Sequence, residues 1–126
     1  LDFDLNPSFK VSAVNFGRLA AEWKFHDGGL HVELPAPSEA TFTITVVYKG
    51  ILHDPPHRDE VRFVVGEKCD GTIQAEGAFL PGSAEWYPDI AGSMARFTVI
   101  AKVPEDWEVI GQGARHETRR LPLAPP

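Results

Sequence analysis

Short alternating apolar runs, separated by glycine and proline, constrain the fold of this chain more than any other feature. The clearest run covers residues 42–48, where every second residue is large and apolar and most residues between them are threonine. Such alternation is typical of a β-strand with one buried face. No segment repeats its apolar residues at the helical period of about 3.6 residues. The sequence therefore predicts an all-β fold.

A β-hairpin is predicted over residues 19–34. The apolar residues of its core face are Leu19, Ala21, Trp23 and Phe25 before the turn, and Leu30, Val32 and Leu34 after it. Asp27, Gly28 and Gly29 between the two runs supply the positive-φ positions that a tight hairpin turn needs.

Further strands are expected on both sides of this hairpin. A first strand includes Phe9, Val11 and Ala13 on one face. Later strands are predicted at residues 61–65, 72–79 and 96–103, with 107–110 pairing at the end of the long one, whereas 52–59 is expected to be a solvated loop and 66–71 a turn. Together these runs predict an antiparallel β-sandwich or a saddle-shaped, curved sheet of about eight strands.

One β-domain is expected to occupy residues 1–120. A chain of 126 residues can bury a core without disulfide or metal support. Its 43% hydrophobic and 24% charged residues are close to the average for globular domains. Residues 121–126 contain three prolines and cannot form a strand ladder, so they are predicted to be a proline-rich tail or linker.

Charge and hydropathy exclude several classes of partner. The net charge of −6 argues against nucleic acid or an anionic membrane surface as the main partner. No apolar run approaches the ~20 residues of a transmembrane helix, and no secretory signal is visible. Cys69 is the only cysteine, so the chain cannot form an internal disulfide.

Two stretches invite a search for a metal site. His53, Asp54 and His57 lie in one proline-rich stretch, but zinc needs three or four converging ligands and no second cluster completes this set. An exposed polar loop is the preferred interpretation. His116 begins a near match to the H-E-x-x-H motif of metalloproteases, but Arg120 stands in place of the second histidine and cannot bind zinc.

Other reactive side chains do not converge either. Lys68 can lower the pKa of the neighbouring Cys69 thiol, but the sequence assigns this cysteine no general base. His31 and Glu33 share the outer face of one strand, where two neighbours are normally solvated. We therefore expect no catalytic residue, no metal ligand and no cofactor in this chain.

Trp86, Tyr87 and Trp107 are the candidate contacts with a partner or a ligand. Trp86 and Tyr87 lie in a loop before a proline, where they can cap the core, touch a ligand or dock another domain. Trp107 follows residues 103–106, which predict a turn after the long strand. Because a buried tryptophan removes a large apolar area from water, capping of the core is preferred for both tryptophans.

Several short stretches occur in an order that suggests a family. They are a strand-and-proline step at residues 29–35, an aromatic-x-Gly step at 45–50, Gly-x-Phe-Leu at 77–80, Trp-Tyr-Pro at 86–88, a strand closing on Val-Pro at 97–104, and an aromatic residue followed by a short strand ending in glycine at 107–111 or 107–113. In order and spacing these stretches resemble the N-terminal β-domain of zinc aminopeptidases of the membrane alanyl aminopeptidase type.

The resemblance implies a saddle-shaped β-domain that packs against a catalytic domain and shapes the substrate entrance. The family's Gly-x-Met-Glu-Asn motif, zinc-binding helix and catalytic tyrosine belong to the following domain, and none has a match here. It therefore implies a non-catalytic chain, with zinc expected only in the missing catalytic domain, its partner. Two alternatives stay open: a carbohydrate- or ligand-binding module that uses Trp86 and Tyr87, and an Ig-like spacer.

Overall fold

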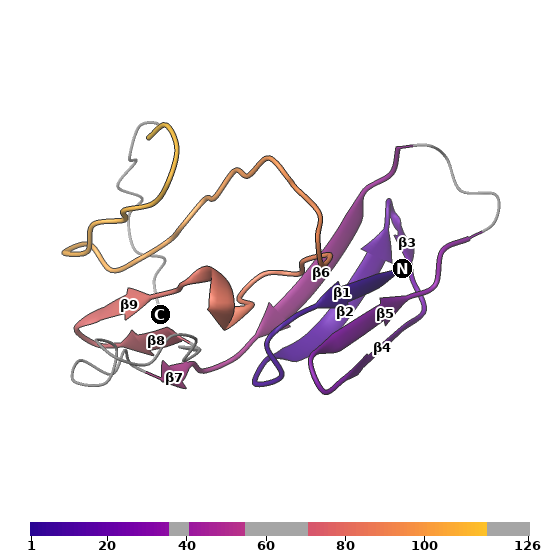
Figure 1. Cartoon of the computed structure of the whole chain (residues 1–126), viewed down its shortest axis with the longest axis horizontal. Coiled ribbons are helices and arrows are strands. Elements are labelled where there is room, and N and C mark those ends of the chain that lie inside the picture. The colour runs from indigo at the N-terminus through magenta and orange to yellow at the C-terminus, as the bar shows by residue number, and fades with distance from the viewer. Residues whose placement is uncertain (36–40, 55–70, 116–126) are drawn as a thin grey trace. The chain divides into compact units, whose positions relative to one another are not determined.

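The computed structural model describes residues 1–35, 41–54 and 71–115 (Figure 1). The chain divides into two units, Leu1–Met94 and Ala95–Pro126. The described part is mostly β and contains no α-helix. Its elements are β1 (Asp2–Asp4), β2 (Lys10–Phe16), β3 (Leu19–Ala20), β4 (Trp23–His26), β5 (Gly29–Val32), β6 (Ile44–Lys49), β7 (His53–Asp54), β8 (Gly71–Gln74), β9 (Gly77–Phe79) and a 3-10 turn, η1 (Gly82–Ala84).

The strands form three small antiparallel sheets in the first unit. Their strand orders are β1-β5-β4, β3-β2-β6 and β7-β8-β9. The predicted all-β, antiparallel character is confirmed in the part of the chain that the structure describes. None of the sheets closes on itself, so each keeps two outer strands.

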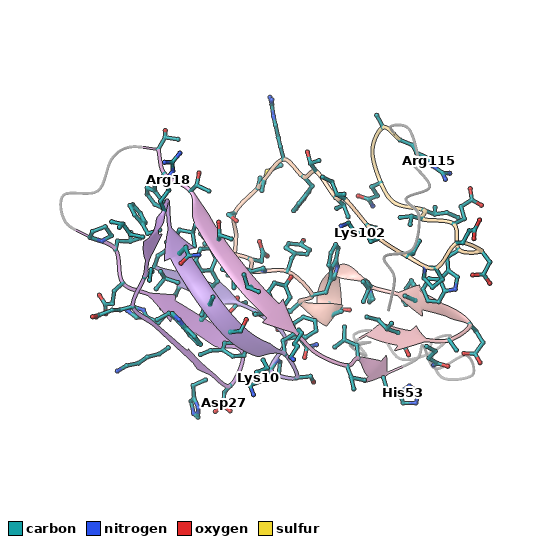
Figure 2. The ribbon with its side chains drawn as sticks, turned by 180° about the vertical axis from the view of Figure 1, so that it is seen from behind. Lys10, Arg18, Asp27, His53, Lys102 and Arg115 are labelled. Carbon is teal, nitrogen blue, oxygen red and sulfur yellow. The ribbon has the colours of Figure 1, made fainter. Side chains whose placement is uncertain are left out.

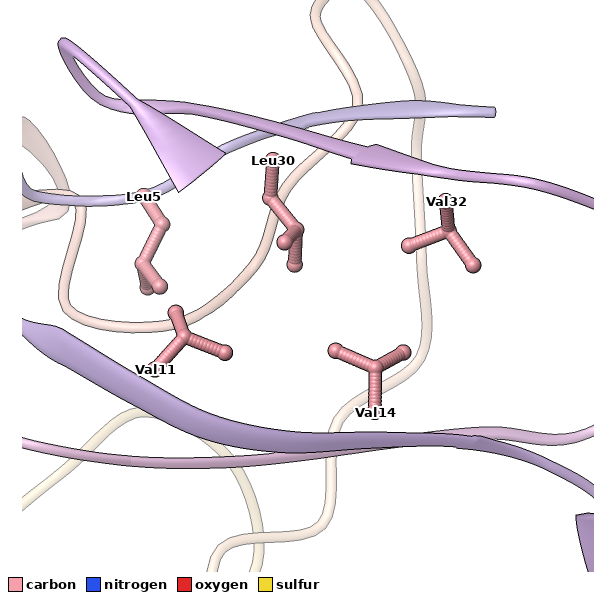
Figure 3. Packing of buried hydrophobic residues seen from close by; sticks show 5 residues of the cluster. All are labelled: Leu5, Val11, Val14, Leu30 and Val32. Atoms are coloured by element: carbon pink, nitrogen blue, oxygen red, sulfur yellow. The ribbon is translucent and has the colours of Figure 1, made fainter. Parts of the chain in front are cut away.

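The hydrophobic core lies between the first two sheets. Leu5, Leu30 and Val32 point toward Val11 and Val14, and all five are buried (Figure 3). Half-buried side chains surround them: Phe3, Phe9, Ala21, Trp23, Phe25, Ile44, Val46 and Tyr48. Burial of these apolar groups is the main force that holds the two sheets together.

The predicted hairpin forms between β4 and β5, but its first strand is shorter than expected. Asp27 and Gly28, with φ of 48° and 83°, make the two-residue turn between His26 and Gly29. The prediction that one run continues from Leu19 to Phe25 is wrong. The Ala21 amide bonds to Val14 in the second sheet, whereas the Glu22 carbonyl accepts from Glu33 next to the first sheet. The chain changes sheets at this point, and Leu19 is left 70% exposed in β3.

A β-bulge changes which face of β2 is buried. The sequence placed Phe9, Val11 and Ala13 on one face, but Val11 and Val14 are the buried pair. The pairing of β2 with β6 shifts register between Val11 and Ala13, so two residues separated by three positions reach the same core. The alternation predicted for β6 is confirmed, since Ile44, Val46 and Tyr48 pack against the core.

The third sheet corrects two further expectations. Residues 72–79 are not one strand: β8 and β9 form a hairpin around a turn at Ala75 and Glu76. Part of the predicted loop 52–59 is a strand, because β7 pairs with β8 and Leu52 beside it is buried. The alternation of side chains alone could not show either pairing. The rest of that loop, the predicted strand 61–65 and the turn 66–70 lie outside the described residues.

The long strand predicted at residues 96–103 is absent, as is the short one at 107–110. In this second unit Ile100 and Ile110 are each 87% exposed. A strand requires hydrogen bonds to a neighbouring strand, and no ladder forms among residues 95–115. The turn that was predicted before Trp107 does form, with the Trp107 amide donating to the Pro104 carbonyl at 3.0 Å.

Candidate functional site

The aromatic segment at residues 84–89 is fastened along the N-terminal part of the chain. The Asn6 amide donates to the Glu85 carbonyl at 2.8 Å. Asp4 and Asp89 exchange two backbone hydrogen bonds of 2.7 and 3.0 Å and form an isolated antiparallel bridge. The segment is therefore held at both ends by backbone contacts to residues 4–6.

The Asn6 side chain adds a buried contact between these two stretches. Its Nδ2 donates to the Ala84 carbonyl at 2.7 Å, and its Oδ1 accepts from the Ser8 amide at 2.8 Å. Asn6 is only 3% exposed, and Ala84 is fully buried. A buried polar group without a hydrogen-bond partner destabilises the folded state. The Asn6 side chain therefore helps to fix the position of the aromatic segment against the N-terminal part of the chain. The sequence did not single out Asn6, since one asparagine before a proline is typical of any turn.

Tyr48 connects β6 to the same segment. Its hydroxyl donates to the Trp86 carbonyl at 2.6 Å, and its ring contacts that of Phe9 with centroids 5.1 Å apart. Burial raises the pKa of the Tyr48 hydroxyl above its ordinary value. The tyrosine therefore stays a neutral hydrogen-bond donor at physiological pH.

Of the three candidate contact residues, two lie in the first unit and one lies in the second. Trp86 and Tyr87 are half-buried and meet edge to face, with ring centroids 4.9 Å apart and planes at 85°. Trp107 is half-buried in the second unit. The structure thus brings Trp86 and Tyr87 together within the first unit.

A small apolar cavity opens beside this segment. It measures about 270 Å³ and is lined by Phe3 of β1, Ile44 and Val46 of β6, and Pro88. Among the described residues the lining has no titratable or nucleophilic side chain, so the cavity suits an apolar group. The sequence predicted that Ile44 and Val46 lie on the inward face of β6. It did not predict that Pro88 lies beside them, because the position of Pro88 depends on the bridge between Asp4 and Asp89.

The metal candidates are only partly within the described residues. His53 is exposed in β7, and its side chain projects outward from the ribbon (Figure 2). His57, Cys69, His116 and Arg120 lie outside the described residues. Across residues 1–35, 41–54 and 71–115, no group of three or more His, Cys, Asp or Glu side chains could hold a metal ion. In the same ranges, no helix has the length and hydrophobicity to span a membrane.

His31 is more closely engaged than the sequence suggested. Its Nδ1 lies 2.6 Å from Asp2 Oδ1, and its Nε2 lies 3.0 Å from Glu33 Oε1. The hydrogen bond to Asp2, and next that to Glu33, raises the pKa of His31. The same hydrogen bond from His31 lowers the pKa of Asp2. All three side chains are exposed to water, which screens the ion pairs.

Comparisons with known proteins leave the family open. No family model matches the sequence, and neither the curated proteins nor the solved structures contain a match to it.

Replacing Tyr48 with phenylalanine tests whether its hydroxyl anchors the aromatic segment. We expect Tyr48→Phe to lower the free energy of unfolding by about 0.5–1.5 kcal/mol, because the half-buried Trp86 carbonyl loses its donor. Tyr48→Leu also removes the ring from Phe9 and should cost more. Chemical denaturation followed by tryptophan fluorescence measures both variants, and an unchanged midpoint for Tyr48→Phe would show that the hydrogen bond contributes nothing.

Proposed function

We propose that this chain is the non-catalytic N-terminal β-domain of a zinc aminopeptidase-like protein. Its role is to pack against a catalytic domain elsewhere in the parent protein and to shape access to that domain's active site. We also propose that its antiparallel sheets belong to a sandwich or a saddle-shaped curved sheet, as in that family. Zinc and the reacting groups then belong to the catalytic domain.

The contact between Tyr48 and Trp86 is the observation that carries this proposal. Tyr48 belongs to the aromatic-x-Gly stretch at residues 45–50, and Trp86 begins the Trp-Tyr-Pro stretch. These are two of the stretches on which the resemblance rests, and a 2.6 Å hydrogen bond joins them. Val46 and Pro88, from the same two stretches, line one cavity. Their contact supports a shared structural purpose, which is to cap the core of a scaffold.

Exposed apolar side chains in the second unit support the proposal that this chain packs against a partner domain. They are Phe97, Val99, Ile100, Val103, Val109 and Ile110, with exposed fractions from 41% to 87%. Large apolar groups at the surface favour burial against another protein surface. An Ig-like spacer, which contacts its neighbours only at its ends, does not account for them.

Activity and metal content of the isolated chain test the non-catalytic assignment. We expect no hydrolysis of aminoacyl-anilide substrates and no stoichiometric zinc after incubation with the metal and gel filtration, because the described residues assemble no metal-binding group. Hydrolysis that co-elutes with the protein and is abolished by a chelator would overturn the proposal. Independently, the parent gene downstream of Pro126 should encode a zinc-binding helix of the H-E-x-x-H type.

The ligand-binding alternative has a separate test. A carbohydrate module should bind on a glycan array and lose that binding in Trp86→Ala, provided that circular dichroism shows the variant to be folded. Trp107→Ala provides a control with the same loss of aromatic area in the other unit. We expect no glycan to bind either the chain or its variants.

A further inference from the structure

A three-residue charge cluster joins β1 to β5 on the outer face of the first sheet. In this sheet Asp2 lies directly opposite His31, and Glu33 follows two residues later. The two carboxylates contact different nitrogens of the His31 ring, at 2.6 and 3.0 Å. His31 is thus held from both sides, by one residue of β1 and one at the end of its own strand.

This geometry favours a doubly protonated imidazole. A carboxylate only accepts hydrogen bonds, so each ring nitrogen must carry a proton to donate one. When the ring loses a proton, one nitrogen presents a lone pair to a carboxylate oxygen. That contact then changes from attractive to repulsive, and the link through Asp2 or through Glu33 is lost.

Strand β1 is short, and two of its residues contact other parts of the first unit. Only three residue pairs join β1 to β5, and the Leu1 ammonium adds a hydrogen bond of 2.9 Å to the Val32 carbonyl. Phe3 at the centre of β1 lines the apolar cavity, and Asp4 at its end bonds to Asp89. The attachment of β1 therefore affects both the cavity and the aromatic segment.

Other charges near His31 come from each strand packed beside it. From β1 they are Asp2, Asp4 and the Leu1 ammonium; from β4 they are Lys24, directly opposite His31, and His26 further along; near the end of β5 they are Glu33 and Glu22. Partial desolvation of the ring opposes its protonation. The two carboxylates in direct contact with the ring outweigh it.

We propose that His31 is a pH-sensitive latch for β1, closed while its imidazole is protonated and loosened when the imidazole is neutral. The latch controls how firmly Phe3 closes one side of the cavity and how firmly Asp4 holds the segment at residues 84–89. This is a regulatory property of the domain, and it does not depend on the proposed aminopeptidase context.

The direction of the pH effect follows from the two pKa shifts. The raised pKa of His31 means that its stabilising contribution is complete below the ordinary histidine value of about 6.5 and is lost as pH rises through the higher folded-state value. The lowered pKa of Asp2 means that its contribution is present above the ordinary aspartate value of about 3.9 and is lost only in stronger acid. The latch is closed between these limits.

Hydrogen exchange at the Val32 amide tests the latch directly, because this amide donates to the Leu1 carbonyl at 2.8 Å. We expect its protection factor to fall by about two- to fivefold between pH 6 and pH 8.5, the range expected for exposed ion pairs. His31→Gln removes the titrating ring and should abolish this fall. Nitrogen chemical shifts of the His31 ring should report protonation over the same pH range.

His26→Gln is the matched control. His26 is 89% exposed in its side chain, and among the described residues it pairs with its neighbour Asp27, at 3.1 Å, and not with β1, so its loss should leave the pH dependence at Val32 unchanged. The latch is overturned if the unsubstituted chain and His31→Gln show the same pH profile. It is also overturned if His31 titrates while the protection factor of Val32 stays constant.

Discussion

Leu30→Ala should lower the free energy of unfolding by about 2–5 kcal/mol, the largest effect we expect from any single substitution in this chain. Leu30 is fully buried between the two sheets, where its side chain points toward Val11 and Val14 (Figure 3). Truncation removes apolar contacts and leaves a cavity that the flanking strands cannot fill without moving. Urea denaturation followed by tryptophan fluorescence measures the loss.

Leu19→Ala is the matched control for this prediction. The same atoms are removed, but Leu19 is 70% exposed in β3, so the free energy of unfolding should change by less than about 0.5 kcal/mol. Leu30→Val gives an intermediate variant if Leu30→Ala does not fold. Equal losses for Leu19→Ala and Leu30→Ala would show that the core does not lie where the structure places it.

Asn6→Ala should produce the second-largest loss. The Asn6 side chain donates to the Ala84 carbonyl at 2.7 Å and accepts from the Ser8 amide at 2.8 Å. Removing it leaves partners without a hydrogen bond, at about 1–3 kcal/mol for each one that remains buried. Unfolding by urea measures the total. Exchange at the Asp89 amide, which bonds to Asp4, should show whether the aromatic segment loosens first.

The chain's other asparagine offers the control. Asn15 is half-buried in β2, and its side chain makes no hydrogen bond to a described residue. Asn15→Ala should therefore change the free energy of unfolding by no more than about 0.5 kcal/mol. If Asn6→Ala is as mild as Asn15→Ala, the buried amide does not hold the segment, and the backbone bonds to residues 85 and 89 and the Tyr48 hydroxyl hold it instead.

Local sequence patterns were sufficient to predict the elements whose contacts join residues close together in the sequence. The turn at Asp27 and Gly28 needs two residues with positive φ, and an aspartate-glycine pair is typical of such a turn. The inward face of β6 follows from strict alternation, because one sheet face is buried and the other is exposed. Both predictions depend on the geometry of a single strand or turn, so no distant partner was required.

Features that depend on contacts between distant residues could not be predicted from local sequence patterns. The bulge in β2 moves Val14 to the core, and the change of sheet between Ala21 and Glu22 exposes Leu19. The alternating segment at residues 96–103 forms no strand among the described residues, although its pattern equals that of β6. Alternation shows that a segment could form a strand. Whether it does so depends on a neighbour to which its backbone can bond.

The candidate site shows the same division. The sequence identified Trp86 and Tyr87 as a capping pair or a contact surface, because large aromatic side chains beside turn residues seek burial. It gave no sign of Asn6, of the cavity beside Pro88, or of the pair formed by Asp2 and His31. Each of these requires segments that are separated by 29 to 85 positions in the chain to meet.

By itself, then, the sequence determined an antiparallel β-protein, its central hairpin and the inward face of β6, because alternation and turn residues act over a few neighbouring positions. Only the tertiary structure decided which strands pair, where the bulge shifts the core, and which polar groups become buried together. Those outcomes depend on the backbone hydrogen bonds and apolar contacts available between distant segments, and a pattern read along one strand carries no information about its partner.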